Sequence, residues 1–278
     1  MKKLWLNTNG RLKAGIIITI FFVILGFVVY YIPHINPFTY DSYPSKLSPS
    51  KAHILGTTSM GQDVYWLGIT AIHNSLLIGL IVACIGTIVG VFVGLLAGFS
   101  GGLLDRILTL ITDTFVVIPS LPILILMTSL MKGQATVLMM ALVLGMFAWA
   151  WPSRQIRSLA LSMKERDFIH TAWFSGEGTI QVVVTEILPY ALTWSLSNFM
   201  NATLSAIASE SSLAVLGLSP GNLVSLGNMI QWARERNAIF THQWFWIGSP
   251  IVATVVLFIG LFLLITGYND YLSMKRGR

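Results

Sequence analysis

Six long apolar runs constrain the fold of this chain more than any other feature of its sequence. The runs cover residues 15–32, 74–99, 107–131, 135–152, 187–217 and 246–267. A helix of about 20 predominantly apolar residues crosses the hydrocarbon core of a bilayer. Backbone groups inside lipid must be satisfied within the segment, which a helix achieves. We therefore predict an all-α membrane protein with six transmembrane helices.

The composition agrees with a membrane protein. Apolar residues make up 55% of the 278 residues, charged residues only 10%, and the mean hydropathy is +0.75. Soluble domains carry about 25% charged residues. The single cysteine, Cys84, lies in an apolar run, so we predict neither a disulfide framework nor a metal site. The net charge of +6 is scattered around the runs, which indicates orientation in the bilayer rather than nucleic-acid binding.

The first run has two interpretations. Basic residues precede it, as in a signal peptide, but no small-residue cleavage site follows. We interpret it as the first transmembrane helix. The predicted segments are a cytoplasmic N-terminus at 1–14, the first helix at 15–32, an extracytoplasmic loop at 33–73, a core with the other five helices at 74–268, and a cytoplasmic C-terminus at 269–278. Within the core we predict a cytoplasmic loop at 154–186 and an extracytoplasmic loop at 218–245.

The basic residues are distributed unequally between the two sides of the bilayer. Of the 17 Lys and Arg residues, twelve fall in segments assigned to the cytoplasm and five in outer segments. The cytoplasmic set is Lys2, Lys3, Arg11, Lys13, Arg106, Arg154, Arg157, Lys164, Arg166, Lys275, Arg276 and Arg278, and the outer set is Lys46, Lys51, Lys132, Arg234 and Arg236. Cytoplasmic loops carry the excess of Lys and Arg. Both termini and the loop at 154–186 are therefore predicted to be cytoplasmic.

The segment from Lys164 to Pro189 is polar and interrupted by glycine. Helical spacing places four apolar residues on one face: Phe168, Ile169, Ala172 and Trp173. Gly176 stands where a helix ends on a left-handed residue, and Thr179 offers an N-cap for the next helix. The apolar stripe has no obvious partner within its own loop. We predict a docking surface for another protein, with an ordinary amphipathic loop as the alternative.

Glycine and proline positions predict how the helices pack and bend. The second run carries small residues at every fourth position: Gly86, Gly90, Gly94 and Gly98. This spacing lets a neighbouring helix approach closely. In the third run, Pro119 and Pro122 each remove a backbone donor, so we expect a kink.

The fifth run carries a polar stripe. Its members fall on one helical face: Asn198, Asn201, Ser205, Ser209 and Ser212, with Glu210 immediately beside them. An ionisable group in a membrane faces a bundle interior or an aqueous cavity. Two interpretations remain open: a translocation pathway, or hydrogen bonds that hold helices together. Asp113, in the third run, is the second candidate for a buried acid.

The loop at 218–245 and the start of the last run contain several aromatic residues: Trp232, Phe240, Trp244, Phe245 and Trp246. Aromatic residues at this level usually form an interfacial belt. A docking surface for a partner is the alternative.

Four segments resemble permeases of ABC importers. The segment Lys164–Pro189 resembles their coupling-helix motif, the EAA...G loop, and we refer to it as the coupling segment. Ala172 and Gly176 match the motif, whereas His170 and Thr171 stand where the family usually has Glu and Ala.

The other three segments resemble the second permease of dipeptide and oligopeptide ABC importers. Residues 53–64, HILGTTSMGQDV, resemble the H-P-L-G-T-D-x-x-G-R-D-V segment, with departures at Ile54, Thr58 and Gln62. Asp113 with residues 118–121, IPSL, resembles D...FPSL, and residues 210–218, ESSLAVLGL, resemble E-A-S-L-S-F-L-G-L. The four segments occur in the family's order and spacing.

The resemblance implies the type I ABC importer permease fold, in the plasma membrane, with a pore shared with a homologous permease. It also implies two cytoplasmic ABC ATPase subunits, an extracytoplasmic binding protein that delivers substrate, and alternating access. Coupling to the ATPases is assigned to Arg166, Phe168, Ile169, His170, Ala172, Trp173 and Gly176. The sequence has no G-x-x-x-x-G-K-[ST] motif, so we predict a non-catalytic subunit without a cofactor of its own, whose partner ATPases use ATP and Mg²⁺.

Other functions are possible on the sequence alone. A secondary transporter usually shows internal repeats and intramembrane charges, and we find neither beyond Glu210 and Asp113. An intramembrane enzyme needs a nucleophile–base pair or metal ligands in its spans, whereas the histidines fall in loops or at a span boundary. A scaffold would suit the glycine spacing. For the substrate, we favour peptides, with oligosaccharides or nickel as alternatives.

Overall fold

The computed structural model describes residues 9–32, 36–131 and 136–276, and these are mostly helical. Apart from one antiparallel bridge between Thr57 and Asp63, the described ranges contain no β-structure. The elements are α2 (Gly10–Phe27), η1 (Val29–Tyr31), α3 (Val64–Ser100), α4 (Gly102–Val117), α5 (Ser120–Leu130), α6 (Val137–Ala148), α7 (Ala150–Lys164), α8 (Asp167–Phe174), α9 (Thr179–Val182), the π-helical turn η2 (Val183–Ile187), α10 (Leu188–Val215), α11 (Leu226–Glu235) and α12 (Trp244–Arg276).

Four helical segments are long and apolar enough to cross a membrane: α2 with η1, α3, α6 with α7, and α12. The bent pair α4–α5 makes a fifth if it is counted as one span. α10 has 28 residues, but its polar stripe makes it less apolar than the others. The described helices therefore form a multi-pass membrane protein, in which the fifth predicted run is the most polar.

α3 begins at Val64, well ahead of the predicted start at residue 74. The Asp63 carboxylate caps it, because Oδ1 accepts hydrogen bonds from the backbone N–H of Tyr65 (2.9 Å) and of Trp66 (3.3 Å). An N-cap Asp satisfies donors that a helix start leaves free. The other carboxylate oxygen lies 2.7 Å from Nδ1 of His53, which ties the outer loop to the helix. The loop predicted at 33–73 therefore ends at Asp63.

The third predicted span consists of two helices. α4 ends at Val117, α5 begins at Ser120, and the two are bent by 78°. Pro119 occupies the N-cap position of α5, where its missing N–H leaves no hydrogen bond of the helix interior unmade. The proline kink expected from the sequence is thus a sharp break.

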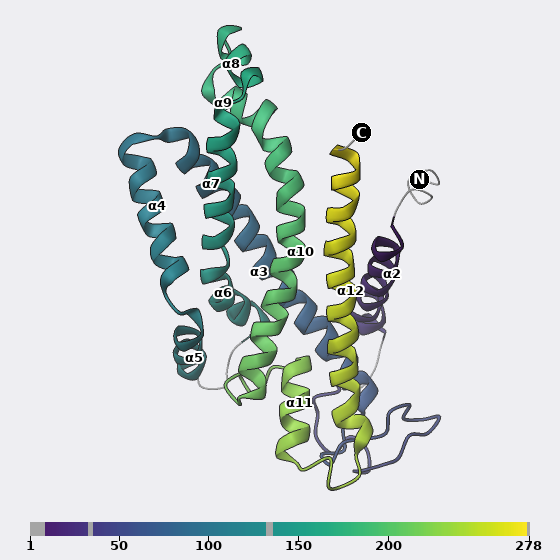
Figure 1. The fold of residues 1–278 in the computed structure, drawn as a ribbon. Coiled ribbons are helices and arrows are strands. Elements are labelled where there is room, and N and C mark those ends of the chain that lie inside the picture. Colours follow the sequence, from purple (N-terminus) through teal and green to yellow (C-terminus); the bar gives the residue numbers. More distant parts are fainter. Residues whose placement is uncertain (1–8, 33–35, 132–135, 277–278) are drawn as a thin grey trace.

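α3 is the central helix of the bundle and packs against α2, α6, α7 and α10 (Figure 1). Four of its glycines, spaced four residues apart, lie against α6 and α7. A Cβ added at each would lie 2.5 to 2.8 Å from the facing residue, in the pairs Gly86 with Ala148, Gly90 with Pro152, Gly94 with Ser153, and Gly98 with Ala160. Only glycine permits the helices to approach this closely along the whole face.

A second close approach joins α2 and α12, and the sequence analysis did not single it out. The glycines that permit it are paired across the two helices: Gly15 with Leu264, Gly260 with Ile18, and Gly267 with Leu12. Polar contacts also join the start of α2 to the last part of α12. Asn9 Nδ2 donates to Asp270 Oδ2 (3.1 Å), and Arg11 lies 3.6 Å from the same oxygen.

The two ends of the bundle differ. Figure 1 shows α8 and α9 at one end, where α2 begins and α12 ends, and α11 at the opposite end. Of the basic residues counted for topology, Lys2, Lys3, Lys132 and Arg278 lie outside the described residues.

Candidate functional site

The coupling segment forms a short helix that ends on a left-handed glycine. α8 has eight residues, and Gly176 follows it with φ = +89°. The Gly176 N–H donates to the Trp173 carbonyl (3.0 Å) and the Glu177 N–H to the Ala172 carbonyl (3.2 Å). This pair of bonds is the Schellman arrangement, which satisfies the last carbonyls of a helix. Gly176 therefore sets the direction in which the chain leaves α8.

The apolar stripe of α8 has a partner within its own loop, which corrects the expectation from the sequence. Ile169 is completely buried in a cluster with Met163, Val182 and Ile187. Ala172 and Trp173 pack against this cluster, together with Leu95, Phe99 and Leu159. The chain after Gly176 turns back under α8, so α9 and η2 cover the stripe. The stripe braces α8 on α3, α7 and η2.

Other side chains of the coupling segment form its exposed surface. Phe174 is 91% exposed and Ile180 is 82% exposed, whereas Phe168 is 38% exposed. Arg166 and His170 are also exposed, and the His170 ring lies 5.6 Å from the Trp173 ring. The sequence analysis missed Phe174 and Ile180 because it followed one helical stripe. Phe174 is the last residue of α8, and Ile180 lies on α9, after the turn at Gly176.

Thr179 is not an N-cap, contrary to prediction. Gly178 holds the cap position, and Thr179 is the first residue of α9. The chain then passes through the π-helical turn η2 before α10 starts at Leu188. The chain from Thr179 to Pro189 therefore consists of two short elements, α9 and η2, followed by the first residues of the long helix α10.

Four of the five residues of the polar stripe on α10 line one cavity of about 310 Å³. They are Asn198, Asn201, Ser205 and Ser209. The facing walls come from α5, with Ser120 and Leu124, and from α6 and α7, with Phe147, Trp151 and Pro152. We call this space the polar cavity. Its α10 wall offers amide and hydroxyl groups, and the other walls are apolar or aromatic apart from Ser120.

Glu210 and Ser212 do not line the polar cavity. Ser212 is exposed, and its hydroxyl donates to the Ala208 carbonyl of the same helix (2.8 Å). Glu210 is fully buried, and its Oε1 accepts a hydrogen bond from Ser225 Oγ (2.6 Å). Ser225 Oγ in turn accepts from the Asn228 N–H (3.1 Å), which caps α11. Glu210 therefore holds the start of α11 against α10.

Asp113 is not a buried acid, contrary to prediction. Its side chain is 44% exposed and lies 3.8 Å from Arg154. The fourth span was predicted to end at residue 152, but α7 continues the helix from α6 as far as Lys164. Arg154 therefore lies within α7.

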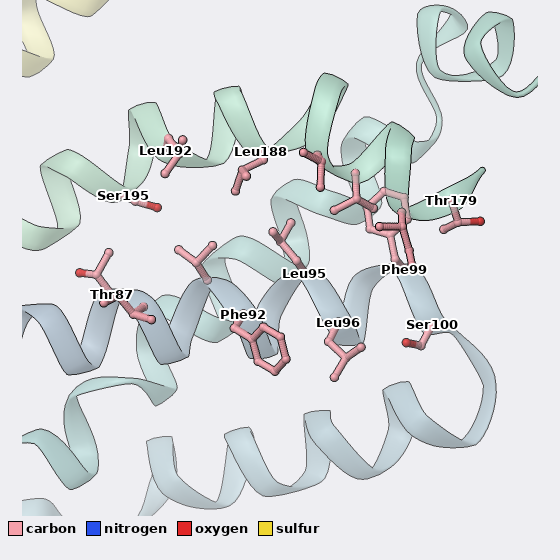
Figure 2. A pocket seen from close by; sticks show the side chains of 15 residues that line it. Thr87, Phe92, Leu95, Leu96, Phe99, Ser100, Thr179, Leu188, Leu192 and Ser195 are labelled. Atoms are coloured by element: carbon pink, nitrogen blue, oxygen red, sulfur yellow. The ribbon is translucent and has the colours of Figure 1, made fainter. Parts of the chain in front are cut away.

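A second, larger space is apolar and faces outward between α3 and α10. It measures about 710 Å³. Figure 2 shows Phe92, Leu95 and Leu96 on α3 opposite Leu188 and Leu192 on α10. Because its walls offer few polar groups, this groove suits hydrocarbon rather than a polar substrate. The polar cavity is the better candidate for a pathway.

Comparison with known proteins decides between the function classes left open by the sequence. A family model described as "Binding-protein-dependent transport system inner membrane component" matches residues 90–278. The chain belongs to this family. It is therefore a permease subunit of an ABC importer, as the four sequence segments indicated, and the secondary transporter, enzyme and scaffold hypotheses are set aside.

Named relatives of this permease transport different substrates. It is 30% identical over 225 residues to the oligopeptide transport system permease protein OppC of Mycobacterium tuberculosis, covering 79% of this chain and 77% of that protein. OppC of Bacillus subtilis is 28% identical over 228 residues, or 80% and 73% of the two chains. The nickel transport system permease protein NikC of Escherichia coli is 28% identical over 261 residues, 91% of each chain.

Proposed function

We propose that this permease imports oligopeptides or dipeptides by alternating access, in a pore formed with a homologous permease. Two cytoplasmic ATPases drive the cycle, and an extracytoplasmic binding protein delivers the substrate. The chain crosses the membrane six times, with α10 as the fifth span and both termini in the cytoplasm. Figure 1 shows that α2 begins at the same end of the bundle as α8, which supports a cytoplasmic start of α2. The excess of basic residues in the segments assigned to the cytoplasm also supports it.

The observation that carries the proposal is the braced helix α8 at the end of the bundle. Its inner side is fixed to α3, α7 and η2 through Ile169 and its neighbours. Its last residue, Phe174, is almost fully exposed, and so is Ile180 on the neighbouring α9, at the edge of the apolar groove. Large exposed apolar side chains rimmed by polar ones mark protein contact sites. A partner that pulls on this surface moves the three bracing elements with it.

The polar cavity supports a peptide as the cargo. The exposed side-chain amide of Asn201 can pair with backbone amides of a peptide, as donor and as acceptor. Asn198 is buried, and its Nδ2 donates to Thr87 Oγ1 on α3 (3.4 Å). Trp151 and Phe147 on the opposite wall offer apolar surface for the side chains of a peptide. Oligosaccharides, which also pair with amides and hydroxyls, are the alternative. Nickel is a second alternative because a nickel permease covers 91% of this chain.

Substitution at Gly176 tests the coupling role. Gly176 has φ = +89° and no atom within 4 Å of a Cβ, so a side chain there fits in space but strains the turn. We expect Gly176→Arg to abolish ATP-dependent uptake of a labelled dipeptide or oligopeptide into vesicles that hold the whole complex, while the chain still inserts. Gly178→Arg is the matched control, because Gly178 has the same open surroundings and an ordinary φ of −72°.

The outcome of the same assay also decides the substrate. Normal uptake by Gly176→Arg would contradict the coupling role. Wild-type uptake that is blocked by nickel or by an oligosaccharide, but not by unlabelled peptide, would overturn the peptide assignment and leave the coupling role intact. Uptake without ATP would instead indicate a secondary transporter.

A further inference from the structure

The face of α4 that turns toward the bundle carries four polar residues beside half-buried apolar ones such as Leu108 and Phe115. The polar residues are spaced along one helical face: Asp105, Thr109, Thr112 and Asp113. On the other face, Leu103, Leu110 and Val117 are 73%, 69% and 79% exposed. Within the described chain, α4 gives no side chain to the three apolar clusters of the protein. Lipid offers apolar side chains the same contacts as a helix does, so α4 is held mainly by polar contacts. One aromatic contact adds to them, because the Phe115 ring lies 5.8 Å from that of Phe147 and 5.2 Å from that of Trp149.

The strongest of these contacts joins Asp105 to Arg157 on α7. Arg157 Nε donates to Asp105 Oδ1 (2.7 Å), and Nη2 donates to Oδ2 (2.8 Å). The arginine side chain is 30% exposed and the carboxylate 17%. Thr109 Oγ also donates to Oδ1 (3.0 Å), which fixes the carboxylate. A bidentate pair is directional as well as strong, so α4 cannot slide or rotate on α7 without breaking it.

This pair lies between the coupling segment and the polar cavity. α7 leads directly into α8, while α4 leads through the break at Pro119 into α5, whose Ser120 and Leu124 line the cavity. At its other end, α4 joins α3 through Gly101 and Gly102, with φ of +63° and +58° and no atom within 4 Å of a Cβ. α4 thus lies between two bends. The ion pair attaches it to α7 near its start, and the longer contact between Asp113 and Arg154 (3.8 Å) lies near its end.

We propose that Asp105 and Arg157 are positioning residues that make α4 and α5 move together with α7. This inference rests on the proposed function of the coupling segment. A displacement of α8 passes to α7, through the ion pair to α4, and through α4 to the α5 wall of the polar cavity. Without the ion pair, the ATPases still dock and hydrolyse ATP, but the α5 wall of the polar cavity no longer moves with α7.

The test compares Arg157→Gln with Arg154→Gln in the assembled transporter in vesicles. Arg154 is the matched control, because its contact with Asp113 is longer (3.8 Å) and more exposed and surface pairs contribute little. We expect Arg157→Gln to lower ATP-dependent uptake roughly tenfold or more, the scale of a typical coupling between sites, while ATPase activity and assembly remain. Arg154→Gln is expected to keep wild-type uptake.

A distance measurement shows whether the helices move together. Cys84 is the single cysteine, so a Cys84→Ser background allows spin labels at Ser129→Cys on α5 and Ser162→Cys on α7, both exposed positions. With the native ion pair, we expect the distance between the two labels to have one narrow distribution, the same with and without ATP. In the Arg157→Gln variant, we expect a broad distribution. If that variant does not assemble, Arg157→Lys replaces it, since it keeps the charge but loses the paired bond.

Two results would overturn the inference: wild-type uptake by Arg157→Gln, or a distribution that stays narrow in that variant. The distance measurement needs no ATPase. Failure of the proposed function, seen as normal uptake by Gly176→Arg, is therefore distinguishable from failure of the inference.

Discussion

Individual glycines determine how closely the helices of this permease pack. A Cβ at Gly94 would lie 2.5 Å from the backbone oxygen of Ser153 and 2.8 Å from Cβ of Ile156. Neither atom lies at the end of a flexible chain, so α3 and α7 would have to separate. Gly68, on the same helix, has nothing within 4 Å. A methyl group therefore clashes at Gly94 and fits without contact at Gly68.

This contrast gives a stability prediction. We expect Gly94→Ala to destabilise the protein by about 1–3 kcal/mol, the usual cost of overpacking. Gly68→Ala is expected to be neutral or stabilising, because Ala is the better helix former. Thermal unfolding of the purified complex measures both. Equal unfolding temperatures for the two variants would show that the close approach of α3 and α7 contributes nothing.

At the scale of elements, the sequence predicted the helices better than their ends. The apolar runs indicate where helices lie, but a cap such as Asp63 extends α3 beyond its apolar part, and Pro119 divides one run into two helices. For α8, the pattern indicated the helix and its glycine turn. It could not show that α9 and η2 cover Ile169, because that contact depends on how the chain folds back.

The same limit applies to Glu210. Its place beside the polar stripe suggested a role in the pathway, but one helical position is about 100° from the next. This rotation turns its carboxylate away from the cavity and toward Ser225 at the start of α11. The bond crosses 15 residues of sequence, and no local pattern reveals it.

Substitution at Glu210 tests its role in holding α11. We expect Glu210→Gln to assemble and transport, because the amide oxygen still accepts the hydrogen bond from Ser225. Glu210→Leu leaves the buried Ser225 hydroxyl without its acceptor, which costs about 1–3 kcal/mol. We expect it to loosen α11, which limited proteolysis of the complex detects.

The control for this experiment is Asn201→Leu in the polar cavity, where we expect altered uptake with no change in proteolysis. Altered uptake by Glu210→Gln together with an unchanged cleavage pattern for Glu210→Leu would place Glu210 in the pathway instead.

At the scale of the whole molecule, the exposed surface around α8 and the polar cavity lie in different parts of the permease. α8 and the exposed Phe174 and Ile180 lie at one end, and α11 lies at the other, held to α3 through the bond between Ser75 Oγ and the Leu226 N–H (3.1 Å). The polar cavity is built from α5, α6, α7 and α10. Such an arrangement suits a subunit that receives force at one end and passes cargo along its side.

The most direct test of this account is the composition of the complex. A tagged chain is purified from its own membranes in mild detergent, and the proteins that accompany it are identified by mass spectrometry, for the wild type beside Gly176→Arg. We predict that a second permease and P-loop ATPases accompany the wild type, and that Gly176→Arg keeps the permease but loses the ATPases. A chain that emerges alone, or ATPases held equally by both variants, would contradict a coupling role for α8.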